Sequence, residues 1–155
     1  MTLRIALAAL LFGAASSALA CSCVISDPKT SFKRADAVFV AEVVEYSEPT
    51  ARLRVIERFK GAPSETIEIV TPESSAACGY GSALTPGSRH LFYALKHELM
   101  PYLEVSSCSR SQPVEHASCD LAFLRSRAAW WRSRLSSMRI FDRLGIRWDP
   151  CRPTT

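Results

Sequence analysis

The sequence lacks the patterns that hold a structural metal ion or carry catalysis. Its six cysteines include no Cys-x2-Cys pair, and His90, His97 and His116 do not have the spacing of zinc ligands. Its carboxylates and histidines form no recognisable acid–base set, and no cysteine stands out as a nucleophile. We therefore expect that the protein is not an enzyme and has no cofactor of its own.

An apolar run long enough to span a bilayer is also missing. The main apolar stretch, Ile5 to Ala15, follows the single charge of Arg4 and precedes Ala18-Leu19-Ala20. This pattern predicts a secretory signal peptide over residues 1–20, cleaved before Cys21. No transmembrane segment then remains, and the mature protein is expected to be secreted, into an extracellular or periplasmic space. An uncleaved membrane anchor is the alternative.

Cysteine usage agrees with export. All six cysteines follow the predicted signal. An even number in a small exported chain predicts disulfides, although spacing alone does not select the pairing.

Charge is unevenly distributed along the chain. Residues 21–124 contain 10 Lys and Arg against 13 Asp and Glu, a net charge of −3, whereas residues 125–155 contain 8 Arg and 2 Asp, a net charge of +6. The acidic body and the predicted export argue against a nucleic acid partner. The basic end is expected to be a solvated helix surface, with contact to an anionic surface as the alternative.

Five segments have the composition and alternation of short strands. They are residues 35–46, 52–59, 66–71, 89–95 and 102–106. In the first, one expected face holds Val38, Val40, Glu42, Val44 and Tyr46, and the other holds Phe39, Ala41, Val43 and Glu45. Five short strands joined by turn residues predict a small barrel. The 17-residue connection from Pro72 to Ser88 holds Cys78, and connections of this length are usually functional or disordered.

Two helical regions complete the expected fold. Thr30 is expected to cap a short helix through Phe32 and Arg34. From Val114 to Met138, apolar residues recur at alternating steps of three and four, which predicts one or two helices packed on the barrel. A homodimeric coil is the alternative interpretation of this seam.

The last two cysteines constrain the second helical region. A straight helix through residues 119–144 would carry Cys119 about 37 Å from the helix end, beyond the reach of Cys151. A Cys119–Cys151 disulfide therefore requires a break, for which Arg125-Ser126 and Ser136-Ser137 are candidates.

Several motifs then occur in a specific order. Cys21-Ser22-Cys23-Val24 follows the predicted signal, Pro28-Lys29-Thr30-Ser31-Phe32 comes next, and Ala35-Asp36-Ala37-Val38 begins the first strand. Ser74-Ser75-Ala76-Ala77-Cys78-Gly79 lies between the third and fourth strands, and Cys108 follows the fifth. Over about residues 21–124 the chain thereby resembles the N-terminal netrin-like (NTR) domain of the tissue inhibitors of metalloproteinases, the TIMP family.

The resemblance implies a mainly β, five-stranded OB-fold barrel with flanking helices, here followed by a basic helical extension over residues 125–155. It implies the disulfides Cys21–Cys78 and Cys23–Cys108. In that family the α-amine and carbonyl of the first residue chelate the catalytic zinc of a metalloendopeptidase, and the second side chain enters the S1′ pocket. The implied protease-binding residues are Cys21, which contacts the zinc, Ser22, Cys23, Val24 and the connector residues Ser74, Ser75, Ala76, Ala77 and Cys78.

The chain departs from the family pattern at three places. Ile25 stands where the family usually has Pro, and Lys33 stands where the third disulfide of the family begins. No second disulfide-rich domain follows; the basic extension takes its place. The first departure slightly loosens the segment expected to enter the protease, and the other two affect the accessory contacts of the family; all three leave the predicted chelating group unchanged.

Two alternative functions remain open. A lipoprotein would carry an acylated Cys21, which could neither chelate zinc nor form a disulfide, although Ala18-Leu19-Ala20 is a poor acylation signal. The other alternative is a secreted, disulfide-stapled netrin-like binding module without protease inhibition, because a fold does not fix a function.

Overall fold

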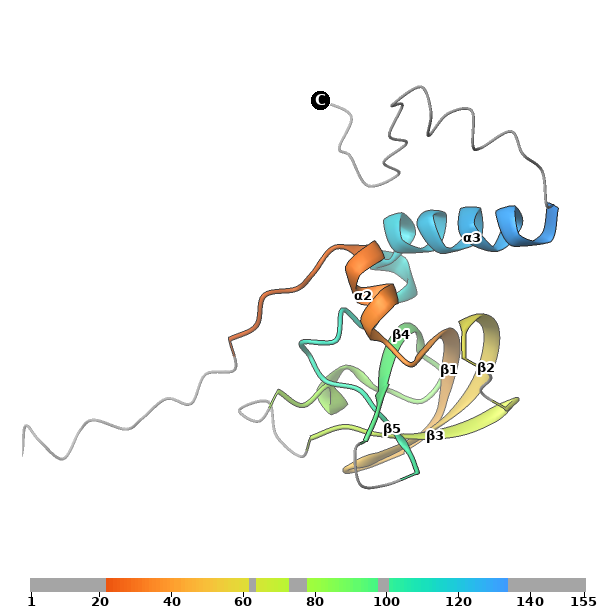
Figure 1. Ribbon diagram of the computed structural model, residues 1–155. Coiled ribbons are helices and arrows are strands. Elements are labelled where there is room, and N and C mark those ends of the chain that lie inside the picture. Colours follow the sequence, from red (N-terminus) through yellow and green to blue (C-terminus); the bar gives the residue numbers. More distant parts are fainter. Residues whose placement is uncertain (1–21, 62–63, 73–77, 98–100, 134–155) are drawn as a thin grey trace, which may run out of the picture.

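Five strands close into a barrel in the computed structural model, which describes residues 22–61, 64–72, 78–97 and 101–133, with side chains in the last helix described as far as Arg127. The strands are β1 (Ala37–Ser47), β2 (Thr50–Lys60), β3 (Thr66–Val70), β4 (Arg89–Lys96) and β5 (Leu103–Glu104). Their order is β1-β2-β3-β5-β4, and β4 returns to pair with β1 (Figure 1). The fold is therefore mainly β, with the closed five-stranded barrel expected from the sequence.

The pairing gives the barrel an OB-fold-like topology. Neighbouring strands are antiparallel, except that β3 and β5 are parallel. A short sixth strand, β6 (Gln112–Pro113), pairs with β4 and was not predicted. Because the five strands form a ring, the barrel offers few free strand edges.

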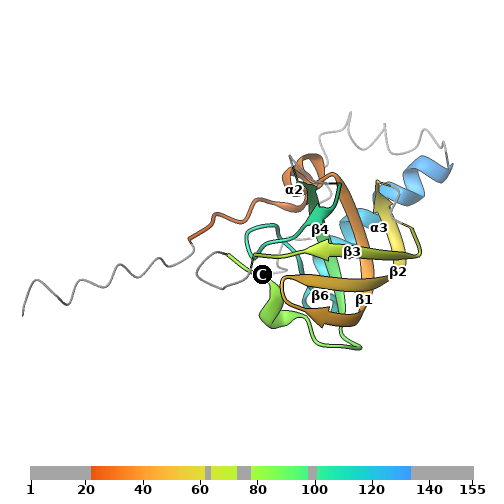
Figure 2. The same ribbon diagram turned by 90° about the horizontal axis from the view of Figure 1, so that it is seen from below.

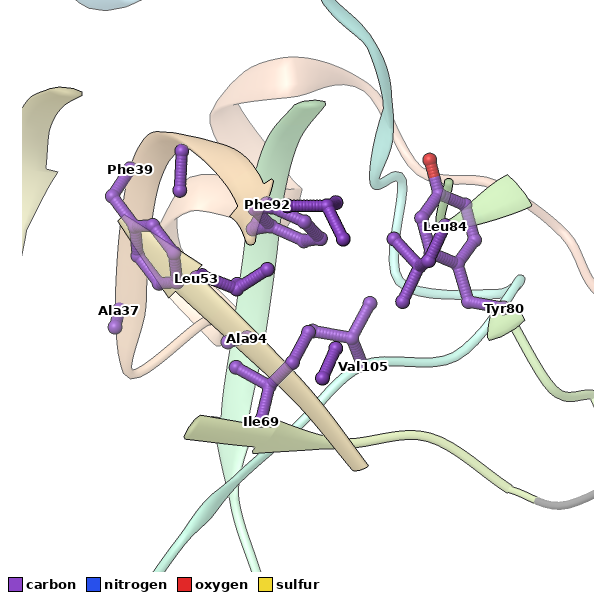
Figure 3. Packing of buried hydrophobic residues seen from close by; sticks show 12 residues of the cluster. Ala37, Phe39, Leu53, Ile69, Tyr80, Leu84, Phe92, Ala94 and Val105 are labelled. Atoms are coloured by element: carbon purple, nitrogen blue, oxygen red, sulfur yellow. The ribbon is translucent and has the colours of Figure 1, made fainter. Parts of the chain in front are cut away.

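β1 is the central strand, and both of its faces are buried. Ala37, Phe39, Ala41 and Val43 face the barrel interior, where Leu53, Ile69, Phe92 and Val105 meet them (Figure 3). Val38 and Val40 point outward into a second apolar cluster with Leu91 and Tyr93. This two-sided burial confirms the faces expected for residues 38–43.

Beyond Val43 the expected faces were wrong. The β1–β2 pairing shifts register between Val43 and Glu45, so that Val44 becomes an extra residue and is 45% exposed. Tyr46 is thereby turned to the interior side and packs against the barrel core, away from the face of Val38 and Val40. A bulge of this kind reverses the side-chain alternation after it.

A short helix, α2 (Pro28–Arg34), precedes β1. Its N-cap is Asp27, whose carboxylate accepts from the backbone N–H groups of Lys29 and Thr30, so the expected cap at Thr30 was wrong. Thr30 instead lies inside the first turn and donates its hydroxyl to Asp27 at 2.6 Å. Pro28 fits the first helical position because the N–H that it lacks would have no partner there.

The later helices lie on the outer face of β1 and β4. They are η3 (Val114–His116), a 3-10 turn, and α3 (Ser118–Ser133). Ala117, Leu121 and Leu124 pack into the cluster of Val38 and Val40, as the apolar period predicted. Figure 1 shows α2 and α3 on the same side of the barrel, where Phe32 and Phe123 meet edge to face at 6.4 Å.

α3 runs unbroken through Arg125 and Ser126. That candidate break is therefore excluded, and the other, Ser136-Ser137, lies outside the described residues. The helix also continues across residue 124, the expected end of the barrel domain, and Arg125 pairs with Glu57 of β2 at 2.9 Å. No helix in the part of the chain that the structure describes is long and apolar enough to cross a membrane.

Candidate functional site

The segment that precedes α2 is the most exposed apolar part of the described chain. Residues 22–27 have no regular secondary structure, and this part of the chain extends away from the start of α2 (Figure 1). Ser22 is exposed, Val24 is 95% exposed and Ile25 is 54% exposed. Two adjacent apolar side chains on the surface, next to the predicted first residues of the mature chain, mark this segment as a candidate contact site.

A disulfide fixes this segment. Cys23 is bonded to Cys108, 85 residues later, with the two Cα atoms 5.5 Å apart. This is the pairing that the family resemblance implied. It places the segment beside the stretch that follows β5, which comes from the opposite end of the barrel sequence.

The end of the connector between β3 and β4 reaches the same place. The carbonyl of Cys78 accepts from the backbone N–H of Ser107 at 2.8 Å and from its hydroxyl at 3.2 Å. Gly79 forms a β-bridge with Ser106. Residues 22–26, 78–79 and 106–110 therefore converge, and we call this region the N-terminal junction.

Other predicted site residues have a different status. Cys78 and Cys119 are each disulfide-bonded, while their expected partners, Cys21 and Cys151, lie outside the described residues. Ser74, Ser75, Ala76 and Ala77 also lie outside them, and so do Leu135 and Met138 of the apolar seam. The role of Cys21 stays a prediction.

A buried ion pair completes the N-terminal junction, and no sequence pattern predicted it. Arg110 donates from Nη1 to the carbonyl of Ser26 at 2.6 Å and from Nε to Asp120 at 2.8 Å. Asp120, in the first turn of α3, is buried and also accepts from Tyr93 Oη at 3.2 Å and from Gln112 Nε2. An Asp at a helix start is ordinary, so only the three-dimensional contacts identify this pair.

His90 forms a second buried polar group, inside the barrel wall. The Tyr80 hydroxyl lies 2.9 Å from Nδ1, and Ser88 Oγ lies 2.9 Å from Nε2. Ser88 donates its own hydrogen to the Thr85 carbonyl at 2.6 Å, so it accepts from Nε2–H, and in the neutral imidazole Nδ1 then accepts from the Tyr80 hydroxyl. Burial lowers the pKa of His90, which favours this neutral form, while Glu115 partly opposes that shift.

These described groups do not assemble into a metal site. Among residues 22–61, 64–72, 78–97 and 101–133, no three His, Cys, Asp or Glu side chains are placed to hold a metal ion. Both ring nitrogens of His90 are hydrogen-bonded within the protein, Nδ1 with Tyr80 and Nε2 with Ser88. The N-terminal junction, in contrast, presents an exposed backbone segment on a cross-linked support, which suits binding to another protein.

Comparison with known proteins adds no family. A scan against protein-family models finds no match, and no curated protein matches the sequence.

Proposed function

We propose that the protein is a secreted inhibitor of zinc metalloendopeptidases that acts as TIMP-family inhibitors do. The observation that carries the proposal is the Cys23–Cys108 disulfide, which holds an exposed segment against the end of the connector at Cys78. Removal of residues 1–20 would make Cys21 the first residue, two positions before this anchor. Its α-amine and carbonyl would then be available to chelate the catalytic zinc of the target.

Zinc chemistry supports this role. A catalytic zinc ion keeps one coordination position open for water or substrate. A neutral α-amine and a neighbouring carbonyl oxygen are both donors, and together they form a chelate. Because an α-amine titrates at about 7.7–8.0, the metal competes with a proton near neutral pH. Inhibition should therefore strengthen as the pH rises through this range.

The disulfide at Cys23 also supports the proposed inhibition, because it restrains the N-terminal segment. Terminal residues are usually mobile, and ordering one backbone residue costs about 1–2 kcal/mol. The bond from Cys23 to Cys108 removes much of that freedom before binding, which raises affinity without adding contacts. Ser22 is exposed beside the anchor, so its small side chain is free to enter an S1′ pocket, and Val24 is free to contact the rim.

The test is to change the first residue while the barrel stays intact. Protein that begins at Cys21 should inhibit a zinc endopeptidase reversibly, whereas the same protein with one Ala added before Cys21 should lose most of its inhibition. Acetylation of the α-amine should have the same effect, because it removes the free lone pair. Equal inhibition by the free, extended and acetylated forms would exclude the chelating mechanism.

The exposed Val24 and Ile25 also suit a netrin-like binding module that inhibits nothing. Such a module should bind its partner equally well with and without the added Ala, since the disulfides are unchanged. An intact mass measurement of the exported protein separates both functions from a lipoprotein, because acylation of Cys21 adds the mass of its lipid chains.

A further inference from the structure

The disulfide alone leaves the direction of the N-terminal segment undetermined. The bond fixes Cys23, and α2 fixes the chain from Asp27 onward, but neither fixes the path of the residues between them. Val24 and Ile25 are exposed and contribute little packing that would oppose such rotation. A second fixed point, between Cys23 and the start of α2, is needed to define the path of this stretch.

Arg110 supplies that second point. It follows Cys108 by two residues, and its Nη1 donates to the carbonyl of Ser26, three residues after Cys23. The stretch 108–110 therefore holds the segment at both ends of the exposed Val24 and Ile25. Ser31 donates to the same carbonyl from its hydroxyl, at the longer distance of 3.3 Å.

Asp120 holds the guanidinium in place. It accepts from Arg110 Nε, and the two side chains are 19% and 2% exposed, so the pair is shielded from water. With Nε bound to Asp120, the planar guanidinium presents Nη1 to Ser26 in a fixed orientation. Asp120 belongs to α3, so the last described helix sets the orientation of the first described segment.

The backbone at Arg110 supports a role for the side chain. Its φ is +62°, in the left-handed region that glycine adopts more readily. A Gly here would relieve the backbone but would abolish both contacts. The contacts of the Arg side chain therefore offset an unfavourable backbone conformation.

We propose that Arg110, held by Asp120, is a positioning residue that fixes the direction of residues 22–26 and so aims the N-terminus at its target. The effect on inhibition rests on the proposed function, whereas the effect on the order of the segment does not.

The sharpest variant is Arg110→Lys, with Arg125→Lys as its matched control. A Lys keeps a cation beside Asp120, but its three N–H donors all sit on one nitrogen, so it does not reproduce the spacing of Nε and Nη1 with which the planar guanidinium holds Asp120 and Ser26. Arg125 lies on α3, as Asp120 does, but its ion pair is with Glu57 of β2 and not with residues 22–26. In Arg110→Lys, the NMR order parameters of Val24 and Ile25 should fall from about 0.85 towards about 0.6. Arg125→Lys should leave them unchanged.

Inhibition should follow the order of the segment. If the binding-competent direction is populated about tenfold less, the inhibition constant should rise about tenfold. Peptide mapping should show that Cys23–Cys108 is intact in both variants. If Arg110→Lys does not fold, Asp120→Asn, which keeps the size of the side chain, should produce the same loss of order.

The outcomes separate the two proposals. Unchanged order parameters in a folded Arg110→Lys protein would overturn the positioning role, and so would an equal loss of order in Arg125→Lys. Loss of order in Arg110→Lys, in a chain whose wild type inhibits no zinc endopeptidase, would support the positioning role and reject the proposed function.

Discussion

At the scale of single residues, the buried His90 predicts a response to pH. Its folded-state pKa lies below the ordinary value of about 6.5, because burial disfavours the imidazolium. The unfolded state therefore binds more protons than the folded state once the pH falls below about 6.5, so this group lowers the free energy of unfolding as the pH falls through that range.

Denaturant unfolding at about pH 7.5 and about pH 5 should detect this loss. His90→Gln should reduce the pH dependence, since Gln keeps a donor and an acceptor but does not titrate. His116→Gln, at an exposed position, serves as the control and should retain the dependence of the wild type. If His90→Gln and His116→Gln respond to pH alike, His90 is not the source.

Gly81 allows a close approach that a methyl group would prevent. A Cβ there would lie 1.8 Å from the hydroxyl oxygen of Tyr46 and 2.5 Å from its Cζ. Figure 2 shows the short helix η2 (Gly81–Ala83, green) beside the end of β1 that carries Tyr46. Gly81→Ala should cost about 1–3 kcal/mol of stability through overpacking.

A double-mutant cycle identifies the partner in this clash. The three atoms nearest to the added Cβ all belong to Tyr46. In a Tyr46→Ala background, Gly81→Ala should therefore change the free energy of unfolding little. The same penalty in both backgrounds would show that another group is responsible.

Few of the side chains that form the N-terminal junction and the buried polar groups were predicted from the sequence. Cys23 and Cys108 were found because ordered motifs resembled a family, but the roles of His90, Arg110 and Asp120 arise only from burial. Arg110 lies in a loop and Asp120 at the start of α3, and the two side chains are hydrogen-bonded. The spacing of two charged residues in a sequence does not predict that their ion pair is shielded from water.

At the scale of elements, Lys60 at the end of β2 stabilises the end of α2. Its ammonium donates to the carbonyls of Phe32 at 2.9 Å, Lys33 at 3.0 Å and Ala35, and it lies 5.4 Å from the centre of the Phe32 ring. These carbonyls lie at the C-terminal end of the helix, where a cation is favourable.

Lys60→Met should therefore lower the free energy of unfolding by up to about 2 kcal/mol. Lys33→Met is the control, because the side chain of Lys33 is exposed in the same turn. Thermal unfolding with circular dichroism measures both. A loss as large in Lys33→Met would assign the effect to helix charge in general.

Element existence was more predictable than element detail. The two apolar faces of β1 and the apolar period of α3 are written in consecutive residues, so they were predicted. The bulge at Val44 depends on how β2 pairs with β1, and β6 has only two residues, so neither had a local signal. Asp27 and Thr30 are both good capping residues, and the Pro at position 28 was the signal that favoured Asp27.

At the scale of the whole molecule, the Cys23–Cys108 disulfide closes a loop of chain that contains the five barrel strands. A closed loop of 85 residues corresponds to about 4–5 kcal/mol in the chain-entropy account of disulfides. The double replacement Cys23→Ser with Cys108→Ser should lower stability by about 2–5 kcal/mol, and denaturant unfolding measures it. A loss below about 1 kcal/mol would mean that the barrel restrains these ends without the bond.

The class of the fold and its closed five-stranded barrel were predicted, whereas the order in which the strands pair was not. Five alternating segments predicted a barrel, but the parallel pair of β3 with β5 joins residues that no turn connects. Pairing between strands far apart in the sequence depends on the whole chain. The sequence pattern therefore predicts where the strands lie, but not the order in which they pair in the sheet.

The separation of Cys23 and Cys108 in the sequence also determines how long after Cys23 its disulfide partner is synthesised. Chains grow from the N-terminus at about 5–20 residues per second, so about 4–17 s separate the synthesis of the two cysteines. During that interval the first residues have no partner for their anchor, and the N-terminal junction cannot form. The proposed inhibitory end would thus be the first part made and among the last to become competent, which ties the onset of binding to completion of the barrel.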